Sequence, residues 1–198
     1  MHELKHKLVS KMNPKSMLYR AFANVVTGTP LIVILNDARK LIPMVLDSLK
    51  LLSKDVLDKD IMYSLLLVLS GILTDKNGKT VYVNIIIFNF KGVYHISNPF
   101  FVSVKVIFSY KLERAGQEAV IENAHIIINC LIGFATYPHT MLVRETTIQC
   151  LVAMSQLPHA RIYPMRIQVL QAVSKALDDP KRAVRQEAVR CRQAWSEI

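Results

Sequence analysis

The sequence is poor in cysteine, and no two of its cysteines are spaced as metal or redox motifs require. Cys130, Cys150 and Cys191 are far apart and form no CxxC pair. Structural zinc sites and iron–sulfur clusters need several cysteine or histidine ligands at short spacings. We therefore expect no cofactor. We interpret the three residues as reduced, buried thiols of a protein found in the cytoplasm and nucleus.

Motifs of catalysis are almost absent as well. There is no glycine-rich phosphate loop and no GxSxG elbow. His2 and His6 do stand four residues apart with a glutamate between them, the pattern with which metalloproteases hold zinc. The extended motif needs glycine and histidine where Val9 and Met12 stand, and the next glutamate is the distant Glu113. We favour an accidental match on a surface helix and predict that the chain is not an enzyme.

Long apolar runs are also missing. The longest covers residues 61 to 73 and contains Ser64, Ser70 and Gly71, so it is too short to span a bilayer. The N-terminus has no apolar core of a signal peptide, and we expect no membrane contact. The formal net charge is instead +10, which indicates acidic partners, either protein or nucleic acid.

What the sequence does contain is a helix pair in residues 161 to 195. In its first part, apolar residues recur at helical spacing and predict one buried face. Asp179 can then cap a second helix through its carboxylate, and Pro180 suits the first helical position, where no backbone donor is needed. The apolar stripe of this second helix consists of Val184, Ala188, Cys191 and Trp195.

The same pattern occurs 41 residues earlier, without a gap. Val143, Arg144, Thr147, Cys150 and Met154 align with Val184, Arg185, Ala188, Cys191 and Trp195. A period near 40 with two helices per unit is typical of HEAT and armadillo repeats. A proline in the first helix, and Asp-Pro followed by Val-Arg, favour the HEAT type. We predict an all-α fold, an α-solenoid of HEAT-type helix pairs.

A segment of different character interrupts these repeats. From residue 78 to 116, β-branched and aromatic residues dominate, and short alternations are typical of strands. We therefore divide the chain into HEAT-like repeats over 1–77, a β-prone insertion over 78–116 and two HEAT repeats over 117–198. The insertion is either a hairpin carried on a loop or, as we hypothesise because it is rich in Phe, Ile, Asn, Lys and Tyr, amino acids that have A/T-rich codons, a retained intron. Detecting its peptides by mass spectrometry in native protein would contradict the intron hypothesis.

Several polar residues of the repeats are candidates for function or for structure. Arg144 and Arg185 occupy one repeat position, and we favour a structural role in which such arginines bond an aspartate in a neighbouring corner. Asp178 and Asp179 stand at the start of a helix, where aspartates cap the helix more often than they act in acid–base chemistry. The last helix is strongly basic and is either a solvated cap or a docking surface for an acidic protein; its basic residues are Lys181, Arg182, Arg185, Arg190 and Arg192.

Beyond these patterns, three stretches resemble a known family in the residues themselves as well as in their periodicity. They are TPLIVILNDARKLIPMVLDSL, ENAHIIINCLIGFATYPHTMLVRETTIQCLVAMSQLPHARIYPMR and SKALDDPKRAVRQEAVRCRQAW. They are similar to the C-terminal HEAT repeats of the MMS-nineteen family (methyl-methanesulfonate sensitivity protein nineteen), in its plant form. The resemblance covers nearly everything outside residues 78 to 116.

The resemblance implies a fragment of a long, non-catalytic adaptor of the cytosolic iron–sulfur assembly targeting complex. Members of this family hand clusters to DNA-repair, helicase and polymerase apoproteins, and their C-terminal repeats bind a WD-repeat propeller and a small partner subunit. We expect the insertion to separate two helices of one repeat and to disturb this docking. The alternative is a basic solenoid that binds nucleic acid directly, which we favour less because no aromatic residues interleave with the basic ones.

Overall fold

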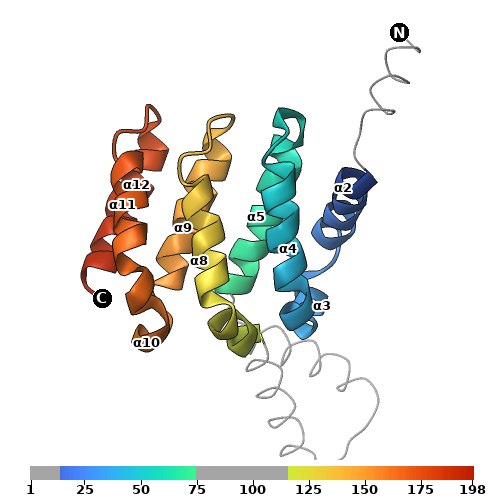
Figure 1. The fold of residues 1–198 in the computed structure, drawn as a ribbon, viewed down its shortest axis with the longest axis horizontal. Helices are drawn as coiled ribbons and strands as arrows, with labels where there is room; N and C mark the ends of the chain where they lie inside the picture. Colours follow the sequence, from blue (N-terminus) through green and yellow to red (C-terminus); the bar gives the residue numbers. More distant parts are fainter. Residues whose placement is uncertain (1–13, 75–115) are drawn as a thin grey trace, which may run out of the picture.

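A computed structural model describes residues 14–74 and 116–198, and the fold of these residues is helical throughout (Figure 1). The β-prone insertion and the His2–His6 motif lie outside the described residues, apart from Gly116. Over the first range the helices are α2 (Pro14–Thr27), α3 (Leu31–Asn36), α4 (Ala38–Leu52), the 3₁₀ helix η1 (Val56–Asp58) and α5 (Lys59–Thr74). Residues 116–122 are helical and are followed by α8 (Ala124–Phe134), α9 (Met141–Met154), α10 (His159–Ile162), η2 (Tyr163–Met165), α11 (Arg166–Ala176) and α12 (Arg182–Ser196).

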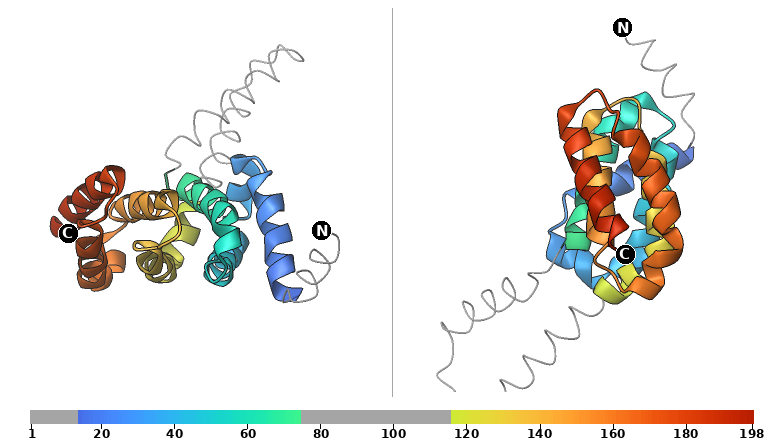
Figure 2. Two further views of the ribbon diagram at one scale, coloured as in Figure 1. Left: turned by 90° about the horizontal axis from the view of Figure 1, so that it is seen from above. Right: turned by 90° about the vertical axis from the view of Figure 1, so that its left-hand side faces the viewer.

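The long helices form antiparallel pairs that stack in one row. α4 pairs with α5, α8 with α9, and α11 with α12, while α2 packs on α4 and α5 at one end. Seen from above, the row has two layers: α4, α8 and α11 form the first-helix layer, and α5, α9 and α12 form the second-helix layer (Figure 2). Neighbouring helices of the second-helix layer pack closely on each other. The predicted all-α solenoid is thus confirmed.

The core of the solenoid includes the residues that the 41-residue repeat predicts. Trp195 is fully buried, and its indole Nε1 donates to the carbonyl oxygen of Leu151 in α9 at 2.8 Å. This bond joins α9 to α12, and so connects two successive helix pairs. The predicted stripes are buried in full: Val143, Thr147, Cys150 and Met154 in α9, and Val184, Ala188, Cys191 and Trp195 in α12.

The helices of the first layer are interrupted, which the sequence analysis did not predict. A continuous helix was expected from residue 161, but α11 begins only at Arg166, after a 3₁₀ turn that contains Pro164. Proline has no N–H for the helix ladder, which explains this break. Residues 116–122 and α8 are likewise separated at Asn123, whose side-chain amide donates to the Ala119 carbonyl at 2.8 Å.

Two further predictions are corrected by the position of the helix ends. Pro180 is not the first residue of a helix, because α12 begins at Arg182 and Pro180 lies exposed in the preceding corner. The segment 75–115 does not separate the two helices of one repeat. It connects α5, the second helix of its pair, to residues 116–122, which lead into the first helix of the next pair.

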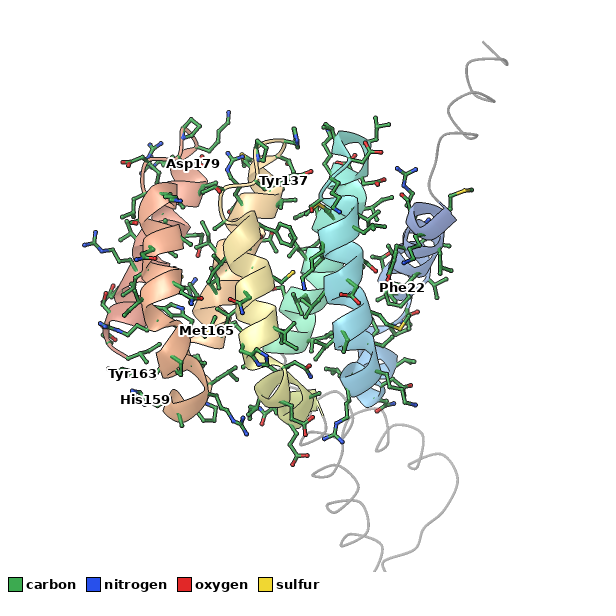
Figure 3. All side chains as sticks on the ribbon, viewed as in Figure 1. Phe22, Tyr137, His159, Tyr163, Met165 and Asp179 are labelled. Carbon is green, nitrogen blue, oxygen red and sulfur yellow. The ribbon has the colours of Figure 1, made fainter. Side chains whose placement is uncertain are left out.

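The described parts on either side of this segment pack into one solenoid. α5 lies beside α9, and Arg39 of α4 pairs with Glu122 at 2.7 Å. The corners that hold Tyr137 and Asp179 lie along the upper edge of the solenoid in the view of Figure 3. None of the helices in the described ranges is long and apolar enough to cross a membrane.

Candidate docking surface at the last helix pair

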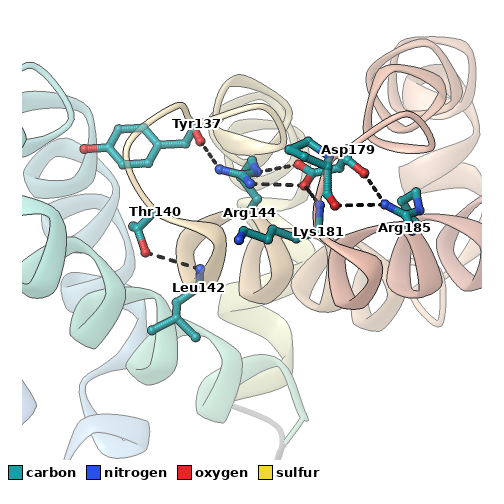
Figure 4. A network of polar contacts seen from close by, with 8 residues as sticks. Tyr137, Thr140, Leu142, Arg144, Asp179, Lys181 and Arg185 are labelled. Carbon is teal, nitrogen blue, oxygen red and sulfur yellow. Dashed lines mark hydrogen bonds and ion pairs between the residues drawn. The ribbon is translucent and has the colours of Figure 1, made fainter.

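The corner between α11 and α12 is fixed to the preceding repeat by a buried ion pair. Arg144, on the fourth residue of α9, donates Nε to Asp179 Oδ2 at 2.5 Å and Nη2 to Asp179 Oδ1 at 3.1 Å (Figure 4). Both side chains are largely shielded from solvent. A guanidinium that binds both oxygens of a carboxylate fixes distance and orientation together. This contact is the pairing that was predicted for arginine at this repeat position.

Asp179 also organises the start of α12. Its Oδ1 accepts the backbone N–H of Lys181 at 2.8 Å, one residue before the helix begins. Burial by itself would raise the pKa of Asp179, but the hydrogen bonds from Arg144 and from the Lys181 N–H outweigh it and hold the pKa below its usual value. The carboxylate is therefore ionised at neutral pH, and it holds the corner as a structural anion. The adjacent Asp178 is exposed.

Tyr137 connects this ion pair to the polar residues of the first repeats. Its carbonyl accepts Nη1 of Arg144 at 2.9 Å. Burial, together with the charges of Asp58 and Asp55, raises the pKa of its hydroxyl. Asp58 is in turn held by Arg20, whose Nε and Nη2 lie 2.7 and 2.9 Å from its two carboxylate oxygens. The corner edge of the solenoid thus carries alternating basic and acidic groups from α2 to α12.

Arg185 stands at the same repeat position as Arg144 but makes different contacts. Its Nη1 donates to the carbonyl oxygens of Asp179 and Pro180, at 2.6 and 3.0 Å, in its own corner. Figure 4 places it beyond Asp179 as seen from Arg144, at the end of the network. The predicted bond from Arg185 to an aspartate side chain is not formed within the part of the chain that the structure describes.

The other basic residues predicted for docking are on the surface of α12, except Lys181, which directly precedes the helix. Arg190 lies 3.8 Å from Glu187, a loose pair on the helix surface. The two predicted repeat residues Val184 and Trp195 are buried and belong to the core. The exposed basic residues are Lys181, Arg182, Arg190 and Arg192, and Arg185 is half-buried.

The far end of α12 is held by residues that the sequence analysis missed. Arg166 donates Nε to the carbonyl of Trp195 and Nη2 to that of Ser196, both at 3.0 Å. His159 stacks on Tyr163 with ring centroids 4.8 Å apart, and its Nε2 lies 3.1 Å from the carbonyl oxygen of Ile198. Positive side chains at the carbonyl end of a helix are favourable. The only signal in the sequence was a basic residue in the first helix of the pair.

The three thiols are buried, as predicted, and two of them, Cys150 and Cys191, lie on the predicted apolar stripes. Burial raises the pKa of Cys130 to about 11 and those of Cys150 and Cys191 to about 12. A thiol of such high pKa is protonated at neutral pH and is a poor nucleophile and a poor metal ligand. Over residues 14–74 and 116–198, no three histidine, cysteine or acidic side chains are grouped closely enough to hold a metal ion.

Together, the stacked helix pairs and the arginine–aspartate corner define a HEAT-type α-solenoid. No family model matches the sequence. The chain is 46% identical over 184 residues, 93% of its length, to an MMS19 nucleotide excision repair protein homolog from Arabidopsis thaliana, of which it covers 13%. The Xenopus laevis homolog is 42% identical over 69 residues, and the Drosophila melanogaster MMS19 nucleotide excision repair protein is 41% identical over 73. The chain belongs to the MMS19 family.

The matched part is a small share of these relatives. It amounts to 35% of this chain and 7% of the Xenopus laevis protein, and to 36% of this chain and 8% of the Drosophila protein. The chain thus spans about an eighth of the length of the Arabidopsis relative and less than a tenth of the animal ones.

Proposed function

We propose that this chain is a non-catalytic adaptor segment that acts in nucleotide excision repair through protein docking. The observation that carries the proposal is its relation to proteins named for nucleotide excision repair, at 46% identity over 93% of the chain. The basic surface of α12, held in place by the corner network, supports docking as the mode of action. Solenoids offer extended surfaces for partners and need no reaction centre.

The partners we propose are the WD-repeat propeller and the small subunit of the iron–sulfur targeting complex. In this proposal the cluster is cargo carried by those partners to DNA-repair and replication apoproteins, in the cytoplasm and nucleus. The chain contributes position alone. The bidentate contact of Arg144 with Asp179 and the bond from Trp195 to Leu151 resist sliding between the last two pairs. The docking surface is thereby held in one register.

A pull-down of the two purified subunits tests the proposal, with the chain in two versions, complete and lacking residues 79 to 116. Binding by both versions supports the adaptor function and makes the segment a tolerated insertion. Binding by the shortened version alone supports the function of the repeats and shows that the insertion blocks it. If neither version binds, the adaptor function is wrong for this chain.

A second candidate is direct binding of nucleic acid, favoured by the exposed basic residues of α12 and the net charge of +10. Against it, the single tryptophan is buried and hydrogen-bonded, so it offers no stacking surface for a base. Binding to phosphates weakens steeply with salt, with a logarithmic slope of about −0.9 per contacted phosphate. Duplex DNA titrations at several salt concentrations distinguish this candidate from protein docking.

A further inference from the structure

The contacts of α9 identify the side of this helix that packs against the following helix pair. Arg144 bonds Asp179 in the following corner, and the carbonyl of Leu151 accepts the indole N–H of Trp195. Ile148, fully buried, lies between them on the same stripe, because side chains at i, i+4 and i+7 share one helix face. This stripe of α9 is covered by the last helix pair.

The repeat places equivalent residues on α12, 41 positions later. They are Arg185, Val189 and Arg192, and we call them the terminal face. Ile148 is fully buried, but its equivalent Val189 is 58% exposed. Arg192 is exposed, while its equivalent Leu151 is buried. No element of the described ranges covers the terminal face, although its equivalent on α9 is a packing surface.

Arg185 is held on this face in the way that Arg144 is held on its own. Each arginine donates Nη1 to a carbonyl oxygen in the corner before its own helix, Tyr137 for Arg144 and Asp179 for Arg185. Arg144 then uses Nε and Nη2 to bind the two oxygens of Asp179. The same two nitrogens of Arg185 have no hydrogen-bond partner among residues 14–74 and 116–198. Because Nη1 already fixes the guanidinium of Arg185, binding of a carboxylate to Nε and Nη2 costs little conformational entropy.

We propose that the terminal face binds an acidic protein partner, and that Arg185 receives a carboxylate of this partner through Nε and Nη2. An apolar side chain of the partner then packs on Val189. Charge complementarity supports an acidic partner, because Arg182 and Arg192 are exposed on the same helix as Val189. The nearby Glu187 does not neutralise Arg185, because its Oε2 is buried and lies 3.8 Å from Arg190. The proposal rests on the docking function proposed above and names the residue that carries it.

The first test measures the affinity of the complete chain for the purified propeller and small subunits by calorimetry. We expect Arg185→Ala and Arg185→Lys to bind about tenfold more weakly, since lysine keeps the charge but cannot contact both carboxylate oxygens. Arg161→Ala is the matched control, because it removes the same charge from an exposed arginine of α10 that is not one of the basic residues assigned to docking, and we expect its affinity to stay within about twofold of wild type. Circular dichroism melting of each variant confirms that it folds.

The second test needs no partner. In NMR spectra of arginine Nε–H groups, sodium acetate added at constant ionic strength should shift the Arg185 signal. The Arg144 signal should stay in place, because its Nε–H is already bound to Asp179.

The two tests together separate the failure of this inference from the failure of the docking function. Wild-type binding that Arg185→Lys leaves unchanged overturns the role of Arg185 and leaves the docking function standing. If the subunits do not bind but acetate shifts the Arg185 signal, the docking function proposed for these subunits is wrong, while Arg185 still binds a carboxylate. If acetate does not shift the Arg185 signal, Nε and Nη2 of Arg185 do not bind a carboxylate, and the proposed site is wrong. Concentration-dependent dimerisation that Arg185→Ala abolishes assigns the face to a second copy of the chain and overturns the proposed partner.

Discussion

Arg144 and Asp179 are 35 residues apart in the sequence and join two successive helix pairs through a buried, two-point contact. The arginine comes from α9, and the aspartate lies in the corner that begins α12. The same guanidinium also binds the Tyr137 carbonyl, so one side chain connects two corners. The relative position of the last two repeats depends on this residue as well as on apolar packing.

Removing either partner of this pair should destabilise the solenoid strongly. Arg144→Ala or Asp179→Ala leaves a buried charge without its partner, which costs roughly 3 to 5 kcal/mol of unfolding free energy. Urea titrations of the two variants and of the double variant measure this cost, and the double variant should lose less than the sum of the single losses. Arg161→Ala, at an exposed arginine of α10, should change stability by less than about 0.5 kcal/mol. Additive losses would show that the pair is not coupled.

The stabilisation from Asp179 should depend on pH in a defined direction. Its pKa is lowered in the folded protein, so the folded chain binds a proton less readily than the unfolded chain. The contribution is complete above the pKa of an unfolded aspartate, about 3.9, and is lost as pH falls through the lower folded pKa. We expect the stability difference between wild type and Asp179→Asn to be constant from pH 5 to 7 and to shrink below about pH 4. A difference that grows on acidification contradicts this sign.

The repeat made the core and the arginine corner predictable from sequence. Residues such as Cys191 and Trp195 recur in register with Cys150 and Met154, and a periodic stripe specifies both the helix and its buried face. The same register identified Arg144 as a corner residue. These features are local or periodic, so one sequence contains the information.

The missed features depend on contacts that have no period. The interruption at Asn123 coincides with a bond from its side-chain amide to the Ala119 carbonyl, a contact that apolar periodicity does not predict. Pro180 was misplaced because the Asp179 carboxylate accepts the N–H of Lys181, forming a turn that keeps the proline outside the helix. Arg166 binds carbonyls about 30 residues away, and no spacing rule predicts such a contact.

The three cysteines should be unreactive in the folded protein. Burial raises their pKa values to about 11 and 12, so the thiolate fraction at pH 8 is very small, and access is blocked as well. With Ellman's reagent at pH 8, we expect no fast reaction in native conditions and three thiols per chain in denaturant. A native burst of one or more thiols would show that a stripe is open to solvent.

Trp195 provides a test of the packing between the last two helix pairs. Trp195→Phe keeps most of the aromatic packing but removes the N–H that donates to the Leu151 carbonyl, and it leaves that buried oxygen without this donor. The expected cost is about 1 to 3 kcal/mol of unfolding free energy, against about 3 to 5 for Trp195→Ala, which adds a cavity. Far-ultraviolet circular dichroism in urea measures both variants. As the single tryptophan, Trp195 also gives wild type a blue-shifted native emission that should move to the red in the same urea range. A red shift at lower urea than the loss of helix would show that the last pair separates first, and that the two bonds from α9 do not couple it to the rest of the solenoid.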